Sequence, residues 1–241
     1  MAATNISTST SPVCVIVGAG PGNGAAFARR FAAGGFRVAL LARDLARLGA
    51  MAGMIPNARA IACDVSDPES VRLAFAAIIQ DLGRIDVLIY NAGKGVWGDA
   101  LAIDEADFEA AWRVNAFGAF LAARLALPAM LGAGSGSILF VGATASRRGR
   151  PGTTAFAAAK AAQRSLAESL ARTYGPRGIH VSLLIVDGVV DEPGTRAKMA
   201  DKPGDFFCKP EDIAETAFFI TRQPPSAWTF ELDVRPFGES W

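Results

Sequence analysis

The chain of 241 residues suits one large α/β domain, and this length can bury a core without disulfides or metals. Its 24 basic and 23 acidic residues nearly cancel, which argues against a nucleic-acid partner. The three cysteines are scattered and lack metal spacing, so no metal site is expected. The sequence has no continuous apolar run of about 20 residues, and its N-terminus is unlike a secretion signal. These features favour a cytoplasmic protein that does not bind a membrane.

Residues 1–11 are polar and are typical of a disordered tail before a domain at 12–241. In that domain, apolar β-type runs alternate with longer segments of helical periodicity. We expect strands at 13–17, 37–42, 58–62, 85–90, 137–141, 180–186 and 230–234, and helices at 22–33, 67–80, 105–131, 154–174 and 210–222. Nearly continuous apolar strands are buried on both faces, so this order predicts a single-domain α/β fold: a Rossmann-like, doubly wound parallel sheet.

Residues 188–208 depart from this regular order, because they are polar and rich in proline and glycine. Long segments of this kind are often functional, so we expect a lid loop over a substrate site.

A glycine-rich stretch, VGAGPGNG at 17–24, follows the first expected strand and opens a helix. Gly18 permits a tight turn, Gly22 permits close approach of a pyrophosphate, and Gly24 permits close packing. The helix N-terminus would direct N–H groups at the phosphates. A glycine motif alone also fits an ordinary strand-to-helix turn, but its position between strand and helix favours dinucleotide binding.

From this point the chain resembles the short-chain dehydrogenase/reductase family, over nearly everything after about residue 12. The motifs that carry the resemblance are CDV (63–65), YNAG (90–93), VNAFG (114–118) and GSILFVGATAS (136–146). The resemblance implies an oxidoreductase with a nicotinamide cofactor. It implies cofactor-binding roles for Gly18, Gly22, Asn23, Gly24, Arg43, Asp64, Val65, Asn91, Ala92, Gly93, Lys160, Gly188 and Val189.

The second strand ends in Ala42-Arg43, where NAD-specific members of the family usually carry an acidic residue. An arginine can pair with a 2′-phosphate that a carboxylate would repel, which favours NADP(H) over NAD(H). The alternative is that Arg43 is merely solvated and Asp44 caps the next helix.

The family's catalytic residues are Asn, Ser, Tyr and Lys, and the matching positions here are Asn115, Ala143, Phe156 and Lys160. Ala143 and Phe156 have no hydroxyl. Loss of a positioned acid costs roughly 10²–10⁴ in rate, and loss of an oxyanion donor costs a similar factor. Standard tyrosine-dependent carbonyl reduction is therefore not expected.

Thr144 and Asp187 are two further candidates for a proton-donating group. Asp187 follows the sixth strand, where a desolvated carboxyl can act as an acid, although a turn or capping role is the more ordinary reading. Thr144 equally fits a hydroxyl bonded to backbone. Three arginines in SRRGR (146–150) could hold an anion, but a solvated basic loop is favoured.

Three functions remain open. The first is an atypical NADP-dependent oxidoreductase with an incomplete catalytic tetrad, acting on a small molecule. The second is an NADP-binding pseudoenzyme that serves as a sensor or oligomer partner, and the third is a lyase or isomerase that uses the same pocket. By resemblance, the alanine-rich helices at 105–131 and 154–174 imply a homodimer or homotetramer, and the apolar residues at 235–241 would tuck against a neighbour.

Overall fold

The computed structural model describes residues 11–238, so the expected tail at 1–11 lies almost wholly outside the described residues. A seven-stranded sheet runs through the molecule in the order β3-β2-β1-β4-β5-β6-β9, and all of its strand pairs are parallel. Its strands are β1 (Val13–Val17), β2 (Arg37–Ala42), β3 (Ala58–Ala62), β4 (Val87–Tyr90), β5 (Gly136–Ala143), β6 (Ile179–Val186) and β9 (Glu231–Val234). The expected single-domain, doubly wound α/β fold is thereby confirmed.

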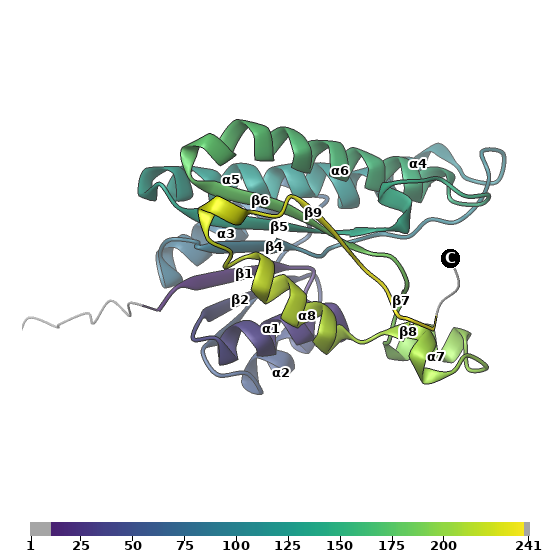
Figure 1. Cartoon of the computed structure of the whole chain (residues 1–241), viewed down its shortest axis with the longest axis horizontal. Helices are drawn as coiled ribbons and strands as arrows, with labels where there is room; N and C mark the ends of the chain where they lie inside the picture. The colour runs from purple at the N-terminus through teal and green to yellow at the C-terminus, as the bar shows by residue number, and fades with distance from the viewer. Residues whose placement is uncertain (1–10, 239–241) are drawn as a thin grey trace, which may run out of the picture.

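Helices cover both faces of this sheet (Figure 1). One face carries α1 (Asn23–Ala33), α2 (Leu45–Gly53) and α8 (Pro210–Ile220), and the other carries α3 (Pro68–Leu82), α4 (Glu105–Trp112), α5 (Gly118–Ala133) and α6 (Thr154–Tyr174). The strand order reverses between β1 and β4, which opens a crevice at the carboxyl ends of those strands.

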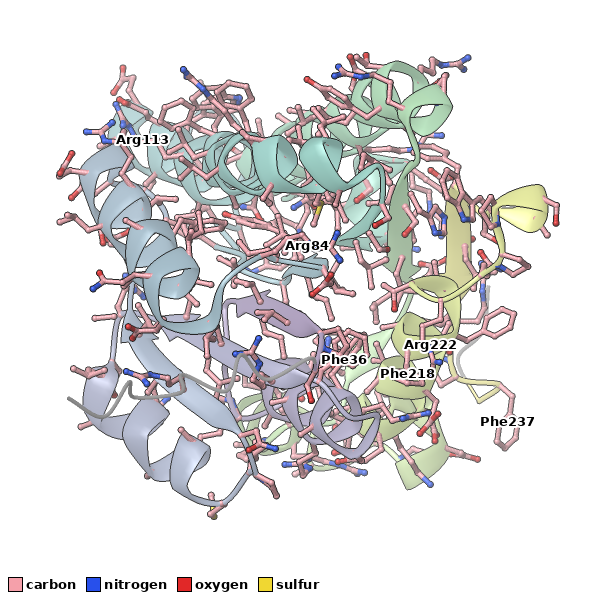
Figure 2. The ribbon with its side chains drawn as sticks, turned by 90° about the vertical axis from the view of Figure 1, so that its left-hand side faces the viewer. Phe36, Arg84, Arg113, Phe218, Arg222 and Phe237 are labelled. Atoms are coloured by element: carbon pink, nitrogen blue, oxygen red, sulfur yellow. The ribbon has the colours of Figure 1, made fainter. Side chains whose placement is uncertain are left out.

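Two apolar clusters lie on opposite faces of the sheet, because alternate residues of each strand point to opposite sides. On the α1 face, Phe31, Phe36 and Phe218 form an edge-to-face group with centroid separations of 5.1–6.3 Å. Figure 2 shows Phe36 beside Phe218. The guanidinium of Arg222 lies over the Phe218 ring, 4.9 Å from its centroid. On the other face, small residues of α5 such as Ala119 and Ala126 are fully buried, which brings that helix close to the sheet.

Three segments differ from the sequence-based expectation. The expected helix at 105–131 is interrupted by a π-helical turn at Arg113–Phe117. Helix α2 was given no bounds from the sequence, but its N-cap is Asp44, as the alternative reading of that residue held: Asp44 accepts a hydrogen bond from Arg47 N at 3.0 Å. The expected lid at 188–208 contains β7 (Val189–Val190), α7 (Pro193–Lys198) and β8 (Phe207–Cys208), with β7 paired to β8.

The continuous helical run Glu105–Ala133 is long and apolar enough to cross a bilayer by length and composition alone. Here it is a core helix, because α5 packs against the sheet and α3. The cysteines Cys14, Cys63 and Cys208 are all buried and form no disulfide.

Candidate active site

The glycine-rich turn after β1 is fixed to the end of β4. Gly18 has φ +87°, and a Cβ added there would lie 2.4 Å from Ala92 N, so only glycine fits this turn. Asn91 Nδ2 donates to Gly18 O at 2.8 Å. Gly24 packs against the turn, because a Cβ there would lie 2.6 Å from Ala19 Cα. Gly22 is the N-cap of α1 and, lacking a side chain, makes no side-chain cap hydrogen bond, while Asn23 begins the helix.

A cavity of about 540 Å³ opens beside this turn, at the reversal of strand order. The structure brings together in its wall most of the residues expected to hold the cofactor: Gly18, Arg43, Asp64, Val65, Asn91, Ala92 and Gly93. Gly22, Asn23 and Gly24 lie at the start of α1 outside this lining, and Gly188 and Val189 follow β6.

Asp64 sits on the floor of this cavity in a tight turn. Its Oδ1 accepts from the hydroxyl and the backbone N–H of Ser66, at 2.7 and 2.9 Å. The Ser66 hydroxyl bond is the main reason that the pKa of Asp64 is lowered, with a smaller contribution from the charge of Arg43. Arg43 therefore lies close enough to influence the electrostatics of the cavity floor.

Asn115 lies in the π-helical turn and is fully buried. Its Nδ2 donates to Lys94 O and Ala111 O, both at 2.9 Å. Its Oδ1 is buried and has no hydrogen-bond partner among the described residues. Such π-turns often occur at functional sites, and this one directs an unsatisfied acceptor toward Gly93.

Lys160, on α6, approaches the same glycine. A Cβ added at Gly93 would lie 3.3 Å from Asn115 Oδ1 and 3.9 Å from Lys160 Nζ, so the two polar groups converge there. The ammonium donates to Val141 O at 2.9 Å and to Gln163 Oε1 at 3.1 Å. Burial lowers the pKa of Lys160 to about 8.

Phe156 lies one helical turn before this lysine, and Ala143 lies two residues after Val141, whose carbonyl the lysine contacts. Ala143 ends β5, and Phe156 lies in the first turn of α6. The Phe156 ring packs on Trp97, with centroids 5.0 Å apart. The hydroxyl of buried Ser146 accepts a hydrogen bond from Ala143 N at 3.1 Å, so it is engaged with the backbone.

Asp187 follows β6 and belongs to a charged cluster. The Thr144 hydroxyl donates to Asp187 Oδ1. Asp187 Oδ2 lies 3.1 Å from Arg235 Nη2 and 3.9 Å from Arg148 Nη2. Both carboxylate oxygens are thus engaged by neighbouring side chains, as in a structural ion pair.

The arginines of SRRGR lie in an exposed loop, as the sequence favoured, but Arg147 also has specific partners. Arg147 pairs with Glu231 and Asp233 of β9, so it ties the loop to the sheet edge. Arg148 remains 54% exposed at its side chain. The sequence offered no local signal for this pairing, because the partners are more than 80 residues apart.

Three residues in the site were missed by sequence reasoning. Gln163 holds the Lys160 ammonium, Trp97 covers Phe156, and Glu192 lies against Gly22. The position of Gln163, three residues after Lys160 on a helix, was the one available signal.

Comparisons with known proteins agree with this architecture. A family model described as short chain dehydrogenase matches residues 12–203. The chain is 34% identical to a 2-(R)-hydroxypropyl-CoM dehydrogenase from Xanthobacter autotrophicus, over 80% of each chain. It resembles a metagenomic short-chain oxidoreductase in complex with NADP, with a TM-score of 0.82, 28% identity, and 95% of this chain and 98% of that one covered. It also resembles a 3-ketoacyl-(acyl-carrier-protein) reductase from Brucella melitensis complexed with NADH, with a TM-score of 0.85, 30% identity, and coverage of 94% and 97%.

Proposed function

Because the chain belongs to the short-chain dehydrogenase family, we propose that it is an NADP(H)-dependent oxidoreductase that works without the family's tyrosine and serine. One observation carries this proposal: Asn115 Oδ1 and Lys160 Nζ converge on Gly93, at the wall of a cavity that the glycine-rich turn borders. Phe156 and Ala143, the residues at the two remaining positions of the proposed tetrad, carry no hydroxyl.

The preference for NADP(H) rests on Arg43. The arginine lines the cavity at the tip of β2, whereas the adjacent carboxylate of Asp44 is engaged as the cap of α2. A guanidinium can pair with the 2′-phosphate that distinguishes NADP(H) from NAD(H). The similar structures include one with NADP and one with NADH, so the preference is drawn from this chain's own residues.

When bound, the nicotinamide would supply or accept a hydride, and the protein must then manage one proton at the substrate oxygen. Asn115 Oδ1 is an unsatisfied acceptor that can hold a water, and the neighbouring Lys160 ammonium is a donor. With a pKa of about 8, Lys160 can exchange a proton near neutral pH. We propose that this pair and a water replace the missing acid, at a cost of roughly 10²–10⁴ in rate.

Calorimetry with NADP(H) and NAD(H) tests the cofactor part of the proposal. We expect tighter binding of NADP(H), and we expect Arg43→Asp to weaken NADP(H) binding far more than NAD(H) binding. Lys160→Ala should also raise the NADP(H) dissociation constant, by removal of a charge-assisted bond worth roughly 1.5–3 kcal/mol. Equal affinity of the wild type for both cofactors would remove the role assigned to Arg43.

The redox part requires turnover. A panel of aldehydes and ketones with NADPH, and of alcohols with NADP, should reveal a slow reaction that depends on Lys160 and Asn115. Lys198→Met is a matched control, because it removes an exposed lysine on α7. Turnover that survives Asn115→Ala and Lys160→Ala would refute the proposed water-mediated route.

A cofactor-binding protein without turnover is the second candidate. It is favoured by the packing of Phe156 on Trp97 and by the engagement of Lys160 with Val141 and Gln163, which leave few polar groups to act on a substrate. Tight NADP(H) binding with no turnover across the substrate panel would support this function. Turnover without a change in cofactor redox state would instead favour a lyase or isomerase.

We also propose a homo-oligomer, joined through α4, α5 and α6 as the family resemblance implies. Support comes from aromatic side chains that remain exposed on α4 and α5: Phe108 (42%), Trp112 (43%) and Phe120 (38%). Light scattering should give a dimer or tetramer that Trp112→Glu weakens. A wild-type monomer at micromolar concentration would refute this proposal.

A further inference from the structure

Glu192 places a carboxylate against the glycine-rich turn. A Cβ added at Gly22 would lie 2.7 Å from Glu192 Oε2 and 3.4 Å from Glu192 Cβ, so this side chain fills the space that a residue at Gly22 would occupy. Gly22 is the N-cap of the 11-residue helix α1 and makes no side-chain cap hydrogen bond. The negative charge of Glu192 therefore lies at the positive end of the α1 dipole.

The chain around Glu192 is held in a defined position. Thr195 Oγ1 accepts from Glu192 N at 3.2 Å and donates to Glu192 O at 3.0 Å. Asp191 and Arg196 form a two-bond ion pair at 2.6 and 2.8 Å, and Asp191 N donates to Cys208 O at 2.8 Å. Figure 1 shows β7, α7 and β8 gathered beyond the carboxyl end of the sheet. We call residues 189–208 the clasp segment.

A dinucleotide places its pyrophosphate over the N-terminal turn of the helix that follows the first strand of such a fold. A carboxylate that lies this close to Gly22 would strongly repel a pyrophosphate bound at the same helix N-terminus. A carboxylate over Gly22 therefore occupies the position that the pyrophosphate needs.

We propose that Glu192 is an internal anion that competes with the pyrophosphate of the dinucleotide and thereby sets cofactor affinity. Its displacement by the ligand also releases the clasp segment from the start of α1. This inference rests on the proposed binding of a nicotinamide dinucleotide.

The first experiment measures ligand affinity by calorimetry in the wild type, in Glu192→Gln and in Asp201→Asn. The control removes an exposed carboxylate from the same segment and changes the net charge equally. The probes are ADP, which carries a pyrophosphate, and 2′-AMP, which carries a phosphate at the Arg43 end alone. We expect Glu192→Gln to bind ADP on the order of 2- to 10-fold more tightly, the range that a charge at a helix terminus supports. Binding of 2′-AMP should not change.

The second experiment follows trypsin cleavage after Arg196 and Lys198 in the full chain. Without ligand, cleavage should be faster in Glu192→Gln than in the wild type or in Asp201→Asn, because the clasp segment has lost the attraction between the Glu192 charge and the N-terminus of α1. ADP should accelerate cleavage of the wild type and have little effect on Glu192→Gln.

The outcomes separate this inference from the proposed function. Unchanged ADP affinity in Glu192→Gln, or an equal gain in Asp201→Asn, would overturn the competition. If no variant binds ADP or NADP(H), the proposed function fails, and the cleavage rates alone then decide whether Glu192 holds the clasp segment. Equal rates in all three proteins would overturn that contact as well.

Discussion

Replacement of Lys160 by methionine should flatten the pH dependence of stability of the ligand-free protein. Lys160 is 5% exposed, and burial lowers its pKa from an ordinary 10.5 to about 8. Between these two values the unfolded chain binds a proton that the folded chain does not. Raising the pH through this window therefore disfavours unfolding, so the wild type gains stability that the variant cannot gain.

The size of this effect follows from the two pKa values. Their difference amounts to ~3 kcal/mol, at about 1.4 kcal/mol for each pH unit. Below pH 8 the folded wild type carries the full cost of the buried ammonium, and above 10.5 it carries none. Methionine retains an unbranched apolar side chain but leaves Val141 O and Gln163 Oε1 without their donor, at a roughly pH-independent cost of about 1–3 kcal/mol each.

Urea unfolding at several pH values between 7 and 10.5 measures this effect. The wild-type free energy of unfolding should rise relative to that of Lys160→Met by ~3 kcal/mol across the range. Groups that titrate in both proteins cancel in this difference. Lys198→Met, which alters an exposed lysine, should give a constant difference. A constant difference for Lys160→Met would refute the reasoning and mean that the buried ammonium is solvated.

Three further sets of substitutions test separate parts of the structure. Phe156→Tyr and Ala143→Ser should each give little carbonyl reduction with NADPH. The rate of the double variant should exceed the sum of the two single-variant rates, because both hydroxyls would serve one substrate oxygen. Additive rates would contradict this coupling. Asp187→Asn should lower the free energy of unfolding by roughly 1–3 kcal/mol through loss of its arginine contacts, and an unchanged urea midpoint would show that these contacts are incidental. Gly18→Ala should destabilise the protein more than Gly35→Ala, since both have positive φ but a Cβ at Gly18 alone meets neighbouring backbone. Equal losses of stability would indicate that the clash at Gly18 relaxes.

The fold was predictable from sequence because its elements are locally encoded. The runs at 13–17, 37–42 and 58–62 became strands with the expected bounds, and 154–174 became α6. The π-turn at Arg113–Phe117 was not predictable, since apolar periodicity does not distinguish it from an α-helix. Asn115 could be identified from the sequence, but its hydrogen bonds could not be predicted, because the π-turn determines how its side chain is oriented.

The rest of the candidate site depends on contacts between distant parts of the chain. Asp187 was identified as a polar group at a strand end, but Arg235, 48 positions later, determines its surroundings. Glu192 faces Gly22 across 170 positions. Such pairs arise when parallel strands bring their carboxyl ends to one edge, and no local pattern encodes which side chains then meet.

The three buried cysteines give this protein a set of internal reporters. Cys14 is the second residue of β1, Cys63 lines the candidate cofactor cavity, and Cys208 lies in β8 of the clasp segment. Burial raises the pKa of Cys14 and raises that of Cys63 to about 11, so these two thiols react slowly with alkylating reagents until the surrounding structure opens. Labelling of Cys208 would report opening of the clasp segment, and labelling of Cys14 would report global unfolding. A slower rate of labelling at Cys63 would report that a ligand has closed the cavity. Mass spectrometry of one unmodified protein sample can thus resolve three motions without any introduced probe.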